Sequence, residues 1–145
     1  MTTNRANFLI VEDNDLDVEK ITRSLEKLRI ANPIARATNG EEALDMLLGT
    51  NGREKLPGPH LILLDINMPR MNGMEFLEEL RRSKDLAKTP VFVITTSDRL
   101  ADVEEAYRHD VCGYIVKPIA MQQIFETLST LDLYWNLSQM SDNVS

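Results

Sequence analysis

Short apolar runs alternate along this chain with longer segments in which apolar residues recur at helical spacing. The expected strands are Phe8–Val11, Ile34–Ala37, Leu61–Leu64, Val91–Ile94 and Gly113–Val116. The expected helices are Asn14–Ile30, Gly40–Leu48, Gly73–Ser83 and Leu100–His109, with a last helix from Ile119. Repeated alternation of strand and helix favours an α/β fold, a doubly wound five-stranded parallel sheet with helices on both faces.

In the first helix, an approximately helical stripe of apolar residues is expected to face the core: Leu16, Ile21, Leu25 and Leu28. The segment Gly49–Pro59 carries several Gly and Pro turn signals and is expected to be an exposed loop. The domain is expected to span residues 8–131, after a tail at 1–7 and before an extension at 132–145 that is first apolar and then disordered.

The chain has 145 residues and a net charge of −7, which suits one folded domain. Excess acid argues against a nucleic-acid surface, because phosphate binding needs clustered Lys and Arg. No apolar run approaches the ~20 residues of a membrane span, and Met1–Asn7 lacks the apolar core of a secretory signal. A cytoplasmic protein is expected. The single cysteine, Cys112, excludes an internal disulfide and is expected to pack at the start of a strand.

Ionisable or hydroxyl side chains that could take part in chemistry follow four of the expected strands. They are Glu12, Asp13, Asp65, Thr95 and Lys117. Each alone is explained by a turn, a helix cap or a solvated side chain. In a parallel sheet, however, the carboxyl ends of the strands share one edge, and ligands bind in the crevice there. The joint pattern therefore indicates one site.

Three carboxylates in one crevice repel each other unless a cation is present. An all-oxygen ligand set without His or Cys suits Mg²⁺. Asp65 stands alone after the most apolar strand and is the expected nucleophile for a phosphoryl group, which would give an aspartyl phosphate. Lys117 would supply a second cation to the phosphoryl oxygens, and the Thr95 hydroxyl would donate to one of them.

These residues stand in four motifs that resemble one known family. The motifs are Glu12-Asp13, Asp65-Ile66-Asn67-Met68-Pro69 with Gly73, Thr95-Thr96-Ser97, and Lys117-Pro118. Together they make the chain similar to the receiver domain of two-component response regulators, the CheY-like domains, over about Phe8–Leu131. The resemblance implies the strand order 2-1-3-4-5 and a Lys117-Pro118 peptide bond that is commonly cis.

The resemblance also implies roles for individual residues. A sensor histidine kinase would transfer a phosphoryl group from a phosphohistidine to Asp65. The implied Mg²⁺ ligands are Glu12, Asp13, Asp65 and the backbone carbonyl of Asn67. The implied phosphate contacts are Thr95, Thr96 and Lys117, and the implied switch residues are Thr95 and Tyr114. Output would pass through protein–protein contacts, so the chain would be a phosphoacceptor and not an enzyme.

Within the family, the long loop and the runs Leu-Leu-Asp-Ile-Asn-Met-Pro and Ile-Thr-Thr-Ser-Asp are most similar to stand-alone regulators of bacterial phytochrome kinases. Two rival functions stay open. A phosphohydrolase that forms an aspartyl phosphate would carry a second Asp two residues after the nucleophile, where this chain has Asn67. A docking module without phosphate would be expected to have lost Asp65, the acid pair or Lys117, and all are present.

The end of the chain is rich in large apolar residues. Its pattern fits either a helical stripe through Ile124, Leu128, Leu131 and Trp135, or the alternation of a strand. Apolar groups beyond the end of a domain usually mark an association surface. The sequence predicts a homodimer, with an interface formed by Leu133, Tyr134, Trp135 and Leu137.

Overall fold

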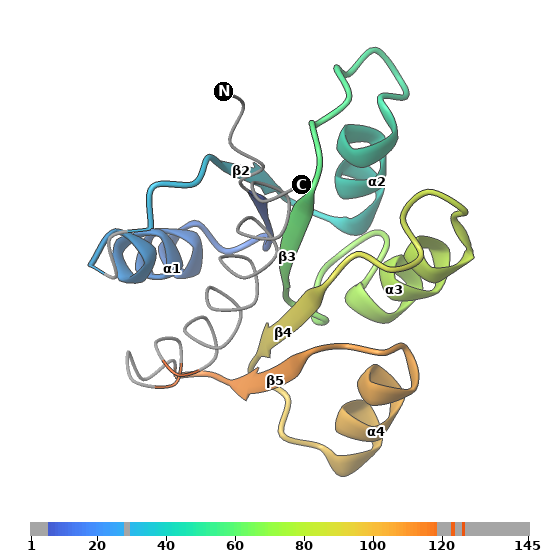
Figure 1. The fold of residues 1–145 in the computed structure, drawn as a ribbon. Helices are drawn as coiled ribbons and strands as arrows, with labels where there is room; N and C mark the ends of the chain where they lie inside the picture. Colours follow the sequence, from blue (N-terminus) through green and yellow to red (C-terminus); the bar gives the residue numbers. More distant parts are fainter. Residues whose placement is uncertain (1–5, 28–29, 119–122, 124–125, 127–145) are drawn as a thin grey trace, which may run out of the picture.

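The computed structural model describes residues 6–27, 30–118, 123 and 126. Its strands are β1 (Asn7–Val11), β2 (Ile34–Ala37), β3 (His60–Leu64), β4 (Val91–Thr95) and β5 (Gly113–Val116). Its helices are α1 (Asp15–Lys27), α2 (Gly40–Leu48), α3 (Gly73–Arg82) and α4 (Leu100–Arg108) (Figure 1). The helix expected from Ile119 and the expected interface residues Leu133, Tyr134, Trp135 and Leu137 lie outside the described residues.

Three strands are one residue longer than their apolar runs. Asn7 pairs with His60 at the start of β1 and β3, and Thr95 pairs with Val116 at the end of β4 and β5. Backbone pairing does not require an apolar side chain, so hydrophobicity alone misses these ends. The extension of β4 matters because it places Thr95 inside the sheet.

The five strands are all parallel and lie in the order β2-β1-β3-β4-β5. This confirms the expected doubly wound sheet. The chain leaves β1 for β2 on one side and returns to the other side of β1 with β3 (Figure 1). The carboxyl ends of β1 and β3 are therefore the switch point of the sheet, where sheets of this type bind ligands.

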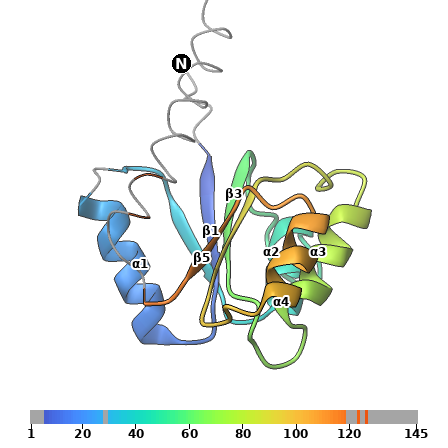
Figure 2. The same ribbon diagram turned by 90° about the horizontal axis from the view of Figure 1, so that it is seen from below.

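Described helices cover both faces of the sheet, with α1 on one face and α2, α3 and α4 on the other (Figure 2). Successive side chains of a strand point to opposite faces, so each strand contributes to two cores. In β1, Ile10 packs in one cluster with Ile21 and Leu25 of α1. Its neighbour Leu9 packs in the other cluster, with Leu47 of α2.

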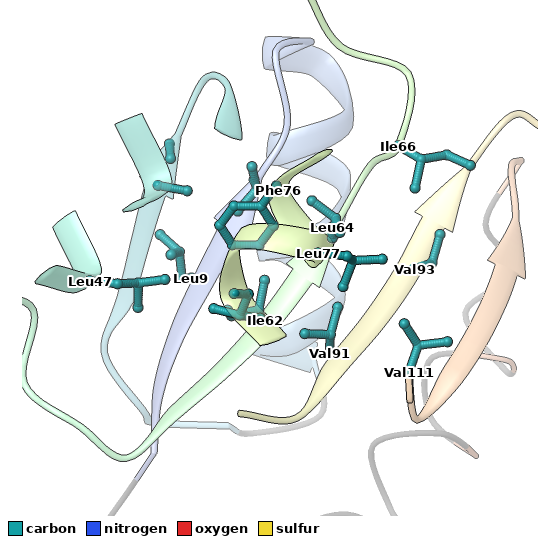
Figure 3. Packing of buried hydrophobic residues seen from close by; sticks show 14 of the residues in the cluster. Leu9, Leu47, Ile62, Leu64, Ile66, Phe76, Leu77, Val91, Val93 and Val111 are labelled. Carbon is teal, nitrogen blue, oxygen red and sulfur yellow. The ribbon is translucent and has the colours of Figure 1, made fainter. Parts of the chain in front are cut away.

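Helix α3 is held on the sheet by its fully buried Phe76 and Leu77. Figure 3 shows both side chains beside the strand residues Leu9, Ile62 and Leu64. Full burial of one such side chain contributes about 1.5–3 kcal/mol. This packing holds α3, the first helix after Asp65, against one face of the sheet.

Two sequence-based expectations about packing are wrong. Leu16 is 59% exposed, although it was expected to share the buried stripe of Ile21 and Leu25. Leu16 and Ile21 are five positions apart, which is about 140° around a helix, so the two side chains cannot face the same core. Cys112 is exposed, although it was expected to pack. It precedes β5, and its neighbour Val111 takes the buried position.

The loop between α2 and β3 is exposed along most of its length, as its turn signals indicate. It is tied down in its second half, where the Leu56 backbone N–H donates to Met46 and the Leu56 carbonyl contacts His60 Nε2 at 2.7 Å. Leu56 also packs against the core. Among the described residues, none of the helices has the length and apolar character that a membrane crossing needs.

Candidate functional site

The central strands β1 and β3 place two acids side by side. Val11 and Leu64 are partners in the sheet, so Glu12 and Asp65, which come directly after them, leave the same edge together. The Asp65 backbone N–H still donates to the Val11 carbonyl, at 2.9 Å. Glu12 is 2% exposed and Asp65 is 6% exposed. Asp13, the second acid after β1, is exposed at the rim.

The strands β4 and β5 bring a hydroxyl and an amine to the same edge. Thr95 is fully buried at the end of β4 and pairs with Val116. The Lys117 backbone N–H donates to the Thr95 carbonyl at 2.7 Å, so Lys117 follows β5 into the site. The Lys117-Pro118 peptide bond is cis, as the family resemblance implies. Residues more than a hundred positions apart, such as Glu12 and Lys117, thus meet at one edge of the sheet.

Lys117 joins the acids into one cluster. Its Nζ lies 2.5 Å from Glu12 Oε1, 2.8 Å from Asp17 Oδ2 and 3.3 Å from Asp65 Oδ2. Burial lowers the pKa of the Lys117 ammonium, but hydrogen bonds to Asp17 and Glu12 and the charge of Asp65 outweigh burial, so the pKa is raised overall. The lysine is therefore a permanent cation of the site.

One lysine cannot neutralise all the carboxylates around it. Burial, with a further contribution from the charge of Asp65, raises the pKa of Glu12 to about 7 against the opposing hydrogen bond from Lys117. The Lys117 charge is shared with Asp17 and Asp65, and Glu12 is the most deeply buried of the three. The carboxylates of the site therefore carry more negative charge than Lys117 alone can neutralise.

The acid cluster fits a hard divalent cation. Carboxylate oxygens of Glu12, Asp13 and Asp65 lie within 4.8 Å of one another, and these ligands are all oxygen. Among the described residues, one other group has comparable spacing: Glu78 of α3, Glu105 of α4 and His109, which directly follows α4. That group contains a His and lacks the buried lysine and hydroxyl, so the strand-end cluster is the better Mg²⁺ candidate.

The raised pKa of Glu12 predicts a pH-dependent stability without divalent cations. A folded-state pKa of about 7, above the ordinary 4.5, gives stabilisation that is complete below pH 4.5 and lost as pH rises through 7. We expect the free energy of unfolding to fall by about 2 kcal/mol between pH 5 and pH 8 because of this group. Urea unfolding in EDTA measures it. Glu12→Gln should flatten the profile and the exposed Glu26→Gln should not; equal slopes in both variants would contradict the assignment.

Asn67 links the loop after β3 to the end of β4. Its backbone N–H donates to Asp65 Oδ1 at 3.0 Å. Its side-chain amide donates to Thr95 Oγ1 at 3.3 Å and to Thr96 Oγ1 at 3.4 Å. Thr96 is exposed at the rim. Sequence reasoning assigned Asn67 only a carbonyl ligand and missed this amide bridge, for which the sequence offers no distinct signal.

The expected switch residues are connected through Ser97. The Ser97 backbone N–H donates to Thr95 Oγ1 at 3.4 Å, and the Tyr114 hydroxyl donates to the Ser97 carbonyl at 2.9 Å. Burial raises the pKa of Tyr114, so its hydroxyl stays a donor. The Ser97 hydroxyl donates in turn to Asp102 of α4. The described contacts therefore run from Thr95 to both Tyr114 and α4.

Asp17 is the other residue of the cluster that sequence reasoning missed. It lies in the first turn of α1, which begins two residues after Asp13. Its nearness in sequence to the acid pair was an available signal. It was not decisive, because an acid in the first turn of a helix is common for electrostatic reasons alone.

Comparison with known proteins agrees with this geometry. The family model described as the response regulator receiver domain matches residues 8–129. Response regulator Rcp1 of Synechocystis is 32% identical over 88% of this chain and 87% of its own length. The Mn²⁺-bound form of Rcp1 has a TM-score of 0.76 at 30% identity, covering 90% of this chain and 94% of the other.

Two further solved structures are similar over most of their length. A two-component response regulator from Legionella pneumophila has a TM-score of 0.78 at 34% identity and covers 88% of this chain and 98% of its own. The bacteriophytochrome response regulator AtBRR has a TM-score of 0.76 at 33% identity, with coverage of 88% and 92%. With a family match over most of the sequence, the chain belongs to the response regulator receiver domain family.

Proposed function

We propose that this chain accepts a phosphoryl group on Asp65 from the phosphohistidine of a sensor histidine kinase. An Asp65 carboxylate oxygen attacks phosphorus, the phosphorus–nitrogen bond breaks, and its electron pair stays on the histidine ring, which is protonated on its other nitrogen and so leaves as a neutral imidazole. The product is an aspartyl phosphate. The chain would act in the cytoplasm as a phosphoacceptor that carries a signal, and it would catalyse only its own phosphorylation and slow dephosphorylation.

One observation carries the proposal: the buried Asp65 carboxylate belongs to an acid cluster suited to a metal and also lies 3.3 Å from the ammonium of Lys117. Lys117 would stabilise charge on the equatorial phosphoryl oxygens. Glu12, Asp13, Asp65 and the Asn67 carbonyl would hold Mg²⁺, and the Mn²⁺-bound form of Rcp1 supports a divalent ion in this family. When bound, Mg²⁺ would neutralise charge on the carboxylates and on the phosphoryl group.

Transfer of label from a small phosphodonor, such as radiolabelled acetyl phosphate, separates this function from its rivals. We expect stable labelling that requires Mg²⁺. A phosphohydrolase would release phosphate in repeated turnovers, but Asn67 stands where such an enzyme would carry its acid, so fast turnover is not expected. A docking module would take up no label. Rapid release or absence of label would each refute the proposal.

Thr95 and Tyr114 would couple phosphorylation of Asp65 to a change in the position of the Tyr114 side chain. A phosphoryl oxygen on Asp65 would accept a hydrogen bond from the Thr95 hydroxyl, which now accepts from Asn67 and Ser97. Movement of Thr95 would disturb the Ser97 backbone, to which the Tyr114 hydroxyl is bonded. The phosphate would thereby shift an equilibrium between two positions of the Tyr114 ring.

Thr95→Ala should uncouple this response from phosphorylation. We expect the variant to bind beryllofluoride, a phosphoryl analogue, with Mg²⁺ within about tenfold of wild type, the loss of one hydrogen bond. The shift of the Tyr114 ring signals in NMR spectra should disappear. Thr22→Ala, which removes a hydroxyl bonded within α1, is the control and should keep the shift. A full Tyr114 shift in Thr95→Ala would contradict the switch.

The partner is proposed from the relatives. The bacteriophytochrome response regulator AtBRR shares most of its length with this chain, which supports a bacterial phytochrome kinase as the phosphodonor. Output would pass through protein contacts, without nucleic acid or membrane binding. Homodimer formation through the apolar C-terminal segment stays a prediction, because that segment lies outside the described residues. Sedimentation of the chain, with and without residues 131–145, tests it.

A further inference from the structure

Asp17 contacts the acid site through its lysine. Asp17 Oδ2 lies 2.8 Å from Lys117 Nζ, and the side chains of the pair are 22% and 9% exposed. Asp17 does not belong to the group of Glu12, Asp13 and Asp65 that suits a metal. Its contact with the site is therefore made through Lys117.

The ammonium of Lys117 has as many carboxylate partners as it has N–H donors. An ammonium donates three hydrogen bonds, and Lys117 directs them to Glu12 at 2.5 Å, Asp17 at 2.8 Å and Asp65 at 3.3 Å. The bond to Asp65 is the longest. All three N–H donors of Lys117 are thus already hydrogen-bonded. Lys117 can donate to a phosphoryl group on Asp65 only if one of these hydrogen bonds breaks.

Asp17 is the partner best suited to release the lysine. Its carboxylate is more exposed than that of Glu12 or Asp65, so water can replace the lost bond at lower cost. Its backbone is also fixed. The Asp17 N–H donates to Asn14 Oδ1 at 3.0 Å, so Asp17 stays with α1 and does not follow the lysine.

We propose that Asp17 is a positioning residue that holds Lys117 back from Asp65 and competes with the phosphoryl group for its ammonium. The inference rests on the proposed function. In the unphosphorylated state, Asp17 and Glu12 hold the lysine close to themselves. Phosphorylation transfers a donor from Asp17 to a phosphoryl oxygen. Asp17 thereby lowers the affinity of the site for phosphate and favours the unphosphorylated state.

The test is a ¹⁹F NMR titration of the chain with beryllofluoride at saturating Mg²⁺. Asp17→Asn keeps the side-chain shape but removes the charged acceptor, so we expect binding about tenfold tighter than in wild type, the scale of one charge-assisted hydrogen bond. Asp17→Glu, which restores a carboxylate, should return towards wild-type affinity. Thermal unfolding of each variant confirms that the protein is folded.

Asp15→Asn is the matched control. Asp15 lies in the same turn of α1 and pairs with Arg36 at 2.7 Å, so this variant changes the net charge equally without touching Lys117. Its affinity should stay within about twofold of wild type. Unchanged or weaker binding in Asp17→Asn, or an equal gain in Asp15→Asn, would overturn the inference. A wild-type chain that binds no beryllofluoride would overturn the proposed function as well.

Discussion

Asp65→Asn is expected to lower Mg²⁺-dependent labelling by roughly a hundredfold or more, because it removes the carboxylate that attacks phosphorus. Asn keeps the size of the side chain. The variant should fold at least as well as wild type without Mg²⁺, since one of the repelling charges around Glu12 is gone. Labelling from a radiolabelled phosphodonor and urea unfolding, measured on the same preparation, separate loss of the nucleophile from loss of the fold.

The control for this result is Asp85→Asn. Asp85 is an exposed carboxylate between α3 and β4, outside the acid cluster. The Asp85→Asn variant should take up label like wild type in Mg²⁺ and, like wild type, should take up no label in EDTA. Wild-type labelling in Asp65→Asn would mean that another residue accepts the phosphoryl group, and the assignment of the site would then be wrong.

Gly73→Ala is expected to lower the free energy of unfolding by about 3 kcal/mol and to impair labelling of Asp65 together with it. A Cβ on Gly73 would lie 2.4 Å from the Ile66 Cα and 2.8 Å from the Asp65 carbonyl oxygen. Both are backbone atoms, so the loop carrying the nucleophile has to move. The gain in helix propensity from Ala, about 1 kcal/mol, does not offset this clash.

Gly52→Ala provides the comparison. Gly52 has a φ of +82°, but a Cβ there meets no atom within 4 Å. The Gly52→Ala substitution should lower the free energy of unfolding by about 1–2 kcal/mol through backbone strain alone, and labelling should be unchanged. Urea unfolding and radiolabel transfer measure both variants. Wild-type stability and labelling in Gly73→Ala would contradict the prediction, because it would mean that the backbone of Asp65 and Ile66 can move to make room for the Cβ at little cost.

Most of the fold could be predicted from the order of elements along the chain. Each expected strand occurs, and so does each expected helix within the described residues. The reason is that strands buried on both faces are short continuous apolar runs, whereas helices show a longer period. The errors concern the ends of elements and single side chains such as Leu16, where an approximate stripe did not respect the angle between positions.

The convergence of Glu12, Asp65, Thr95 and Lys117 also followed from sequence, given a parallel sheet. Each residue lies at a strand end, and parallel strands in register bring these ends to one edge. Their hydrogen bonds did not follow. The bridge from the Asn67 amide to Thr95 depends on how the loop after β3 turns back across the sheet.

The sheet, the edge that carries the site and the residue types gathered there can all be read from the sequence, because they follow from local periodicity and from chain direction. The sharing of charge among these residues depends instead on contacts between distant elements. Lys117 and Asp17 are 100 positions apart, and their contact depends on where α1 packs relative to β5. That packing is set by the whole core beneath both elements, and no local pattern in the sequence records it.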